Sequence, residues 1–220
     1  TASITAGSTV GLTSTNGGLT SDSWTVNASD VTAGVYGDIA IGTASITAGS
    51  TVGLTSTNGG LTSDTWTVDD SDVTAHVYGD IAIGEASATG GSTIDLTSTN
   101  GGLTSSTWLA DASSVTALVY GDIEITGAEV KNGSTVDLTS TGGGLTSDVW
   151  TVNDSDVTAF VYDDIEITVA EIKNGSTVDL TSTNGGLTSN GWAVNDSDVT
   201  AFVYGDIEIT DAEIKNGSTV

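Results

Sequence analysis

A fixed repeat runs through the whole sequence. The stretch GSTVGLTSTNGGLTSDSW at 7–24 returns at 49–66 with one substitution, and its first serine recurs as Ser8, Ser50, Ser92, Ser134, Ser176 and Ser218. A period of this size indicates a solenoid or a propeller, in which a unit buries its apolar face only against its neighbours. We therefore treat 1–220 as a single array, with repeats at 1–42, 43–84, 85–126, 127–168 and 169–210 and a partial repeat at 211–220.

Apolar and polar residues alternate inside each repeat. Val31, Ala33 and Val35 follow a period of two, as do Ile39 and Ile41. This period predicts strands with one buried face. The Asn-Gly-Gly and Gly-Asp steps between the apolar runs predict turns. We therefore expect an all-β fold.

A weaker period of half this length divides each repeat in two, because Ser8 aligns with Ser29 and Val10 with Val31. Each half has room for three short strands, which is close to the size of one turn of a parallel β-helix. We predict a parallel β-solenoid of about ten 21-residue rungs, stacked about 4.8 Å apart into a rod of about 50 Å.

The charges favour the same stacking. The chain has 29 acidic residues, 3 Lys and Arg together, and a net charge of -26, so identical acids in adjacent rungs would repel each other. In the 21-residue alignment, Asp22 lies over Thr43, Asp30 over Thr9 and Thr51, and Asp38 over Gly17 and Gly59. Identical acids then recur only in every second rung.

The tryptophans fit this alignment badly. Trp24 and Val26 share one face, whereas Ile46 in the next rung is one position out of phase with them. Either a bulge resets this side between rungs, or the tryptophans point outward.

A five-bladed β-propeller is the alternative fold, with the partial repeat completing the first blade. Central strands of a blade are packed on both faces, whereas these strands carry Thr, Ser or Gly on one. We therefore favour the solenoid.

The segment GDIAIGTASITAGSTVGLTSTNGG at 37–60 resembles the repeats of filamentous-haemagglutinin-like proteins, which are secreted bacterial adhesins built as long right-handed β-helices. The likeness lies in DVTA, GDIAI and ITAGSTVGLTS and in the later versions GDIEIT and GSTVDLTS, and it covers the whole chain. The resemblance implies a fibrous surface or adhesive role and supplies no catalytic residues.

Composition argues against several classes of function. Phosphate contacts need Lys and Arg, so we expect neither nucleic acid nor an anionic membrane surface as a partner. No apolar run approaches the length of a spanning helix, so we expect no membrane insertion.

His76 is the only histidine and occupies the position of Gly34, Leu118 and Phe160 in other repeats, which indicates a variable outward site. We expect no enzyme; a β-helix lyase or hydrolase would have irregular rungs and one unique cleft.

Acidic turns are the candidate metal sites, and Ca²⁺ is the only cofactor that we consider. Their carboxylates are of the type that Ca²⁺ prefers, but the glycine-rich calcium-roll repeat is missing. The residues are Asp69, Asp70, Asp72, Asp154 and Asp156.

An aromatic stripe is the candidate interaction surface, for lateral association of rods or for stacking on sugar rings. The competing interpretation is that Tyr suits a half-exposed strand and that Trp fills the core. The stripe comprises Tyr36, Tyr78, Tyr120, Tyr162, Tyr204, Phe160, Phe202, Trp24, Trp66, Trp108, Trp150 and Trp192.

Together these features predict a structural segment of an extracellular or cell-surface fibre, adhesin or surface layer. We expect it to associate with itself, either laterally or end to end through the unpaired edges of its outermost strands, and we keep glycans as candidate partners. The alternative is a propeller lectin that binds carbohydrate through one Trp/Tyr site per repeat.

Overall fold

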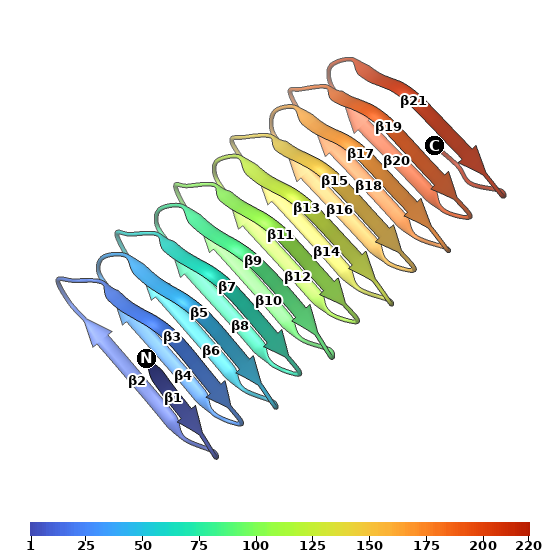
Figure 1. Cartoon of the computed structure of the whole chain (residues 1–220). Coiled ribbons are helices and arrows are strands. Elements are labelled where there is room, and N and C mark those ends of the chain that lie inside the picture. The colour runs from blue at the N-terminus through green and yellow to red at the C-terminus, as the bar shows by residue number, and fades with distance from the viewer.

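The computed structural model describes all residues from 1 to 220. Its 21 β-strands form two sheets, one of 11 and one of 10 strands, in which every neighbouring pair is parallel. The chain winds from one sheet to the other and back, so that successive rungs stack along one axis (Figure 1). The protein is a parallel β-solenoid with rungs about 21 residues apart, and the alternative of a propeller is wrong.

Odd-numbered strands form the long-strand sheet, and even-numbered strands form the short-strand sheet. The long-strand sheet comprises β1 (Ala2–Thr5), β3 (Leu19–Asn27), β5 (Ile39–Thr47), β7 (Leu61–Asp69), β9 (Ile81–Thr89), β11 (Leu103–Asp111), β13 (Ile123–Lys131), β15 (Leu145–Asn153), β17 (Ile165–Lys173), β19 (Leu187–Asn195) and β21 (Ile207–Lys215). The short-strand sheet comprises β2 (Thr9–Ser14), β4 (Asp30–Val35), β6 (Thr51–Ser56), β8 (Asp72–Val77), β10 (Thr93–Ser98), β12 (Ser114–Val119), β14 (Thr135–Ser140), β16 (Asp156–Val161), β18 (Thr177–Ser182) and β20 (Asp198–Val203).

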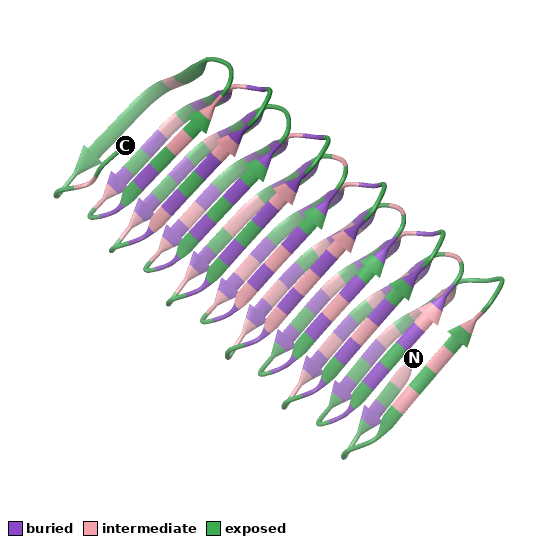
Figure 2. Cartoon of the chain, turned by 180° about the vertical axis from the view of Figure 1, so that it is seen from behind, coloured by how far each residue is buried: buried purple, intermediate pink, exposed green.

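The core lies between the two sheets. Buried and exposed residues alternate along the strands (Figure 2), and 51 buried hydrophobic residues form one continuous cluster. Val10 and Val31 are register partners on parallel neighbours, as the shorter period predicts. Aliphatic side chains therefore stack in columns that a single rung could not bury by itself.

Each rung has two strands, so the prediction of three separate strands is wrong. The long strands change their inward face midway: in β7, Leu61 and Ser63 are buried, and then Trp66 and Val68. Two of the predicted sides are therefore joined in one long strand, and the change of phase marks the corner between them.

The registers of the two sheets explain why the tryptophans seem out of phase. Short strands keep one constant offset, so that Asp72 pairs with Thr51 on one side and Thr93 on the other. Long strands alternate between a shorter and a longer offset, as in Leu61 with Ile81 and then Ile81 with Leu103. The cause is that both turns of the rung alternate in length: the turn after the long strand spans 48–50 and then 70–71, and the turn after the short strand spans 57–60 and then 78–80. The turn length resets the phase, so neither a bulge nor an outward Trp is needed.

All five tryptophans are buried, with exposed fractions of 1% to 5%. Each lies beside alanines in the neighbouring rungs, as Trp66 does between Ala44 and Ala86. A large side chain thus alternates with a small one along the column, which lets the rungs keep their spacing. Because they face the core, Trp24, Trp66, Trp108, Trp150 and Trp192 do not belong to an exposed stripe.

The acidic residues follow the predicted alternation with a corrected register. Asp30 has Thr9 and Thr51 as its neighbours, as predicted. Asp22 lies against Gly42 and not Thr43, because the long strands take the shorter offset here. The two residues are in close contact, since a Cβ on Gly42 would lie 2.4 Å from the Asp22 carbonyl oxygen. Identical acids remain two rungs apart, about 9.6 Å, which weakens their repulsion.

Candidate functional site

A serine ladder runs the length of the rod, at the turns between the long strands and the short strands. The backbone N–H of each serine donates to the Oγ of the equivalent serine in the next rung, over 3.1 to 3.3 Å. Each Oγ donates in turn to a nearby carbonyl, as Ser50 does to Thr47. The ladder comprises Ser8, Ser29, Ser50, Ser71, Ser92, Ser113, Ser134, Ser155, Ser176, Ser197 and Ser218.

The ladder solves a problem of the turn. The backbone N–H at this position is buried, and a buried donor without a partner is costly. Serine is small enough to stack in every rung and supplies both an acceptor and a donor. The serine spacing revealed the repeat, but its hydrogen-bonding role was not predicted.

The turns at the other end of the short strands form what we call the Gly-Asp edge. Here Gly60 N–H donates to Asp38 Oδ1 over 3.0 Å, and the equivalent bonds link Asp80 to Gly102, Asp122 to Gly144 and Asp164 to Gly186. A Cβ on Gly102 would lie 2.4 Å from the Asp122 carbonyl oxygen. Glycine is therefore required, because the next rung passes directly over it.

The remaining aromatic residues of the predicted stripe are exposed, with fractions of 43% to 80%. The tyrosines lie in the turns of the Gly-Asp edge and not on the strands, as Tyr36 does after β4. Phe160 and Phe202 lie on the outer face of β16 and β20, where β8 carries an exposed His76. From here on, the aromatic stripe means Tyr36, Tyr78, Tyr120, Tyr162, Tyr204, Phe160 and Phe202.

The structure does not gather the candidate calcium ligands. Asp69 Oδ1 accepts a hydrogen bond from Thr89 Oγ1 at 2.8 Å, and Asp70 has a left-handed backbone with φ of 48°. Asp154 has the same left-handed backbone, whereas Asp72 and Asp156 begin short strands and have threonines in the adjacent rungs. No three acidic or histidine side chains lie close enough together to hold a metal ion.

The three lysines pair with acids on their own strands. Lys131 Nζ lies 2.9 Å from Glu129 Oε1 and 3.9 Å from Asp111 Oδ2. The hydrogen bond to Glu129, with the charges of both acids, raises the pKa of Lys131 above its ordinary value. Lys173 and Lys215 pair in the same way with Glu171 and Glu213. Such surface pairs contribute little to stability, but they leave the acidic surface without an unpaired lysine.

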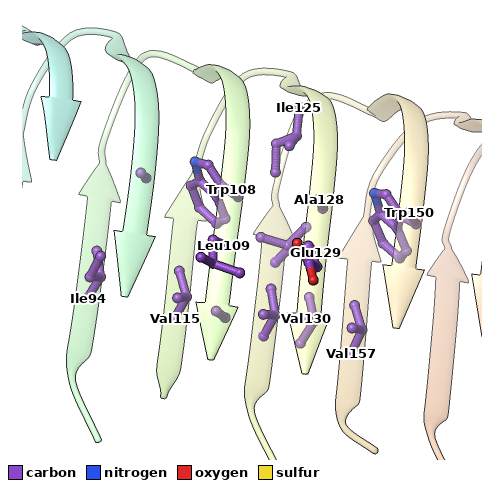
Figure 3. A pocket seen from close by; sticks show the side chains of 14 residues that line it. Ile94, Trp108, Leu109, Val115, Ile125, Ala128, Glu129, Val130, Trp150 and Val157 are labelled. Carbon is purple, nitrogen blue, oxygen red and sulfur yellow. The ribbon is translucent and has the colours of Figure 1, made fainter. Parts of the chain in front are cut away.

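An apolar cavity of about 20 Å³ lies in the core between Trp108 and Trp150 (Figure 3). Its wall includes Ala110, where the other repeats carry valine, so two methyl groups are missing at this point. The indole Nε1 atoms of Trp108 and Trp150 have no hydrogen-bond partner. We interpret the cavity as a local packing defect, because its lining is almost wholly apolar and it has room for only about one water molecule.

Comparison with models of protein families, with curated proteins and with solved structures found no match. The fold is consistent with the predicted β-helix repeat, and no match identifies the chain as a member of the adhesin family. The chain has no helix that is long and apolar enough to cross a membrane.

Proposed function

We propose that this chain is a non-catalytic structural segment of an extracellular fibre, adhesin or surface layer. The observation that carries the proposal is the uniformity of the rod: the serine ladder passes through every rung without a break. The turns keep the same lengths from one repeat to the next, so no long loop interrupts the surface. A chain that stacks identical units in this way supplies length and stiffness, and each added repeat extends the rod by about 9.6 Å.

An extracellular location agrees with the surface of the rod. Its exposed positions are mostly Thr, Asp, Gly and Asn. The net charge of -26 favours solubility and disfavours nucleic acid and anionic membranes as partners. Antibody labelling of intact cells that make the protein tests the location: we expect signal without permeabilisation, and signal only after permeabilisation contradicts it.

Self-association is the second part of the proposal, and one exposed surface supports its lateral form. Phe160 and Phe202 expose large apolar side chains on the short-strand sheet. Lateral packing of rods would cover these side chains.

Sedimentation velocity at two salt concentrations tests self-association. Acidic rods repel each other, so we expect monomers at about 20 mM salt and association at about 0.5 M, where the screening length falls to a few ångströms. The double variant Phe160→Ser, Phe202→Ser should abolish lateral association, with Thr139→Ser as the control. A monomer at every salt concentration contradicts self-association and leaves the rod architecture untouched.

A further inference from the structure

We propose that the Gly-Asp edge carries a row of grooves that bind a neutral polysaccharide chain lying along the rod. Two grooves of this edge are hollowed at equivalent places in the repeat. The first has a volume of about 420 Å³ and is lined by Asp80, Asn100, Gly101, Gly102, Thr104, Tyr120, Gly121, Asp122 and Glu124. The second, of about 450 Å³, has the counterparts Asp164, Asn184, Gly185, Gly186, Thr188, Gly205 and Asp206.

The fold builds each groove from three successive rungs. Two Gly-Asp turns supply its walls, and the Gly-Gly turn of the rung between them supplies its floor. A Cβ on Gly101 would lie 2.4 Å from Asp80 Oδ1, so the floor has to remain without side chains. The N–H of Gly102 holds Asp80 Oδ1 at 3.0 Å, which fixes the carboxylate at the wall. The groove is therefore largely preformed, and binding would need little ordering of the protein.

The chemistry of the lining fits a sugar chain. Asp122, Asn100 and Thr104 offer hydrogen-bond acceptors and donors to hydroxyl groups. Tyr120 lines the groove and is 54% exposed, so an aromatic ring and a phenolic hydroxyl lie beside the polar groups. A few polar groups beside an exposed aromatic ring are what orients a polyhydroxylated ligand. The acidic surface has no unpaired lysine, so anionic polysaccharides would be repelled, and the uncharged side chains of Asn100, Thr104 and Tyr120 suit a neutral polysaccharide.

The spacing of the grooves favours a polymer over a small sugar. The two hollowed grooves are two repeats apart, which corresponds to four rungs and about 19 Å along the axis. An extended chain that follows the edge can occupy both grooves at once, so weak contacts add up as avidity. A short sugar reaches only one groove.

The chain also contains a natural variant of the groove between these two. There Gly142 replaces the asparagine, and Asp163 replaces the glycine at the wall. A Cβ on Gly142 would lie 3.2 Å from Tyr120 Cζ, so the ring of Tyr120 leans over this position. These two residues are tolerated by the fold, and they provide substitutions that alter a groove without breaking a rung.

Affinity electrophoresis with dissolved polysaccharides tests the proposal. The probes are a β-1,3-glucan, a β-1,4-glucan, a galactomannan and the anionic alginate. We expect at least one neutral polymer to retard the wild-type chain, and alginate not to. Oligosaccharides of two sugars should compete about 100-fold less well than those long enough to span both grooves.

The groove variant carries Asn100→Gly, Gly121→Asp, Asn184→Gly and Gly205→Asp, and a second variant carries Tyr120→Ala alone, because Tyr204 does not line the second groove. We expect each to bind about tenfold more weakly, with unchanged circular dichroism and thermal unfolding. Leu118→Thr is the matched control, because it alters an exposed side chain on the outer face of β12, outside the groove. Absence of retardation by every neutral polymer overturns the proposal, as does equal weakening by Leu118→Thr. Neither result touches the proposed structural role, which sedimentation and labelling test separately.

Discussion

The serine ladder makes Ser92→Ala a test of what holds the rungs together. Ser92 is fully buried, and its Oγ accepts the N–H of Ser71 at 3.2 Å. The hydroxyl has one proton to donate, and its nearer acceptor is the carbonyl oxygen of Thr89 at 2.5 Å, with the carbonyl oxygen of Val68 at 3.1 Å. Alanine keeps the backbone of Ser92 in place but removes both the accepted and the donated hydrogen bond.

The loss of stability in Ser92→Ala depends on which backbone groups are left without a hydrogen-bond partner. The Thr89 carbonyl keeps the N–H of Asp70 at 3.2 Å, so it remains satisfied. The N–H of Ser71 has no such substitute and is left buried without an acceptor. A buried unpaired donor costs about 1–3 kcal/mol, so we expect Ser92→Ala to lower the free energy of unfolding by about 2 kcal/mol.

Two measurements separate this effect from a general loss of a hydroxyl group. Urea unfolding followed by the fluorescence of the five buried tryptophans gives the global stability. Hydrogen exchange of peptides that cover 68–77 reports the opening of the turn around Ser71. Ser106→Ala is the matched control, because Ser106 is exposed on β11. If Ser92→Ala and Ser106→Ala change stability and exchange equally, the ladder does not stabilise the rod.

Two further predictions concern packing. Ala110→Val restores the valine of the other repeats beside the cavity and should raise the free energy of unfolding by about 1 kcal/mol, whereas Val152→Ala should lower it by at least as much. A lower free energy of unfolding for Ala110→Val than for the wild type, measured in urea, contradicts the cavity. Gly102→Ala places a Cβ 2.4 Å from the Asp122 carbonyl oxygen and should lower the free energy of unfolding by about 1–3 kcal/mol. Gly53→Ala is the control, because its Cβ meets nothing closer than 4.0 Å. Equal thermal unfolding of both variants contradicts the close stacking of the turns.

The sequence was sufficient to predict the parallel solenoid and its period. Val10 and Val31 stack as expected because the short strands keep a constant offset, and β-branched residues in a period of two leave few other folds. The alternation of acids was predicted for the same reason.

The sequence did not predict the course of the long strands, because one constant offset was assumed for the whole rung. Leu19 pairs with Ile39 at the shorter of the two offsets, and aligning these two apolar residues would have shown that the turns differ in length. That alignment also places Val26 beside Ile46 and puts Trp24 in the core. The grooves of the Gly-Asp edge depend on how three rungs meet, so no local motif indicates them.

Engineered cysteine pairs test the stacking of the rungs most directly, because the chain has no native cysteine. Thr67 lies opposite Ser87 on one side and Ser45 on the other, as the alternating offsets of the long strands require. Neighbours in a parallel sheet are close enough for a disulfide. We predict that Thr67→Cys forms a disulfide readily with Ser87→Cys and, in a separate variant, with Ser45→Cys, but not with Glu85→Cys. Equal or faster oxidation of the Glu85→Cys pair would show that the rungs are not stacked in this register, and the rod and its grooves would have to be abandoned.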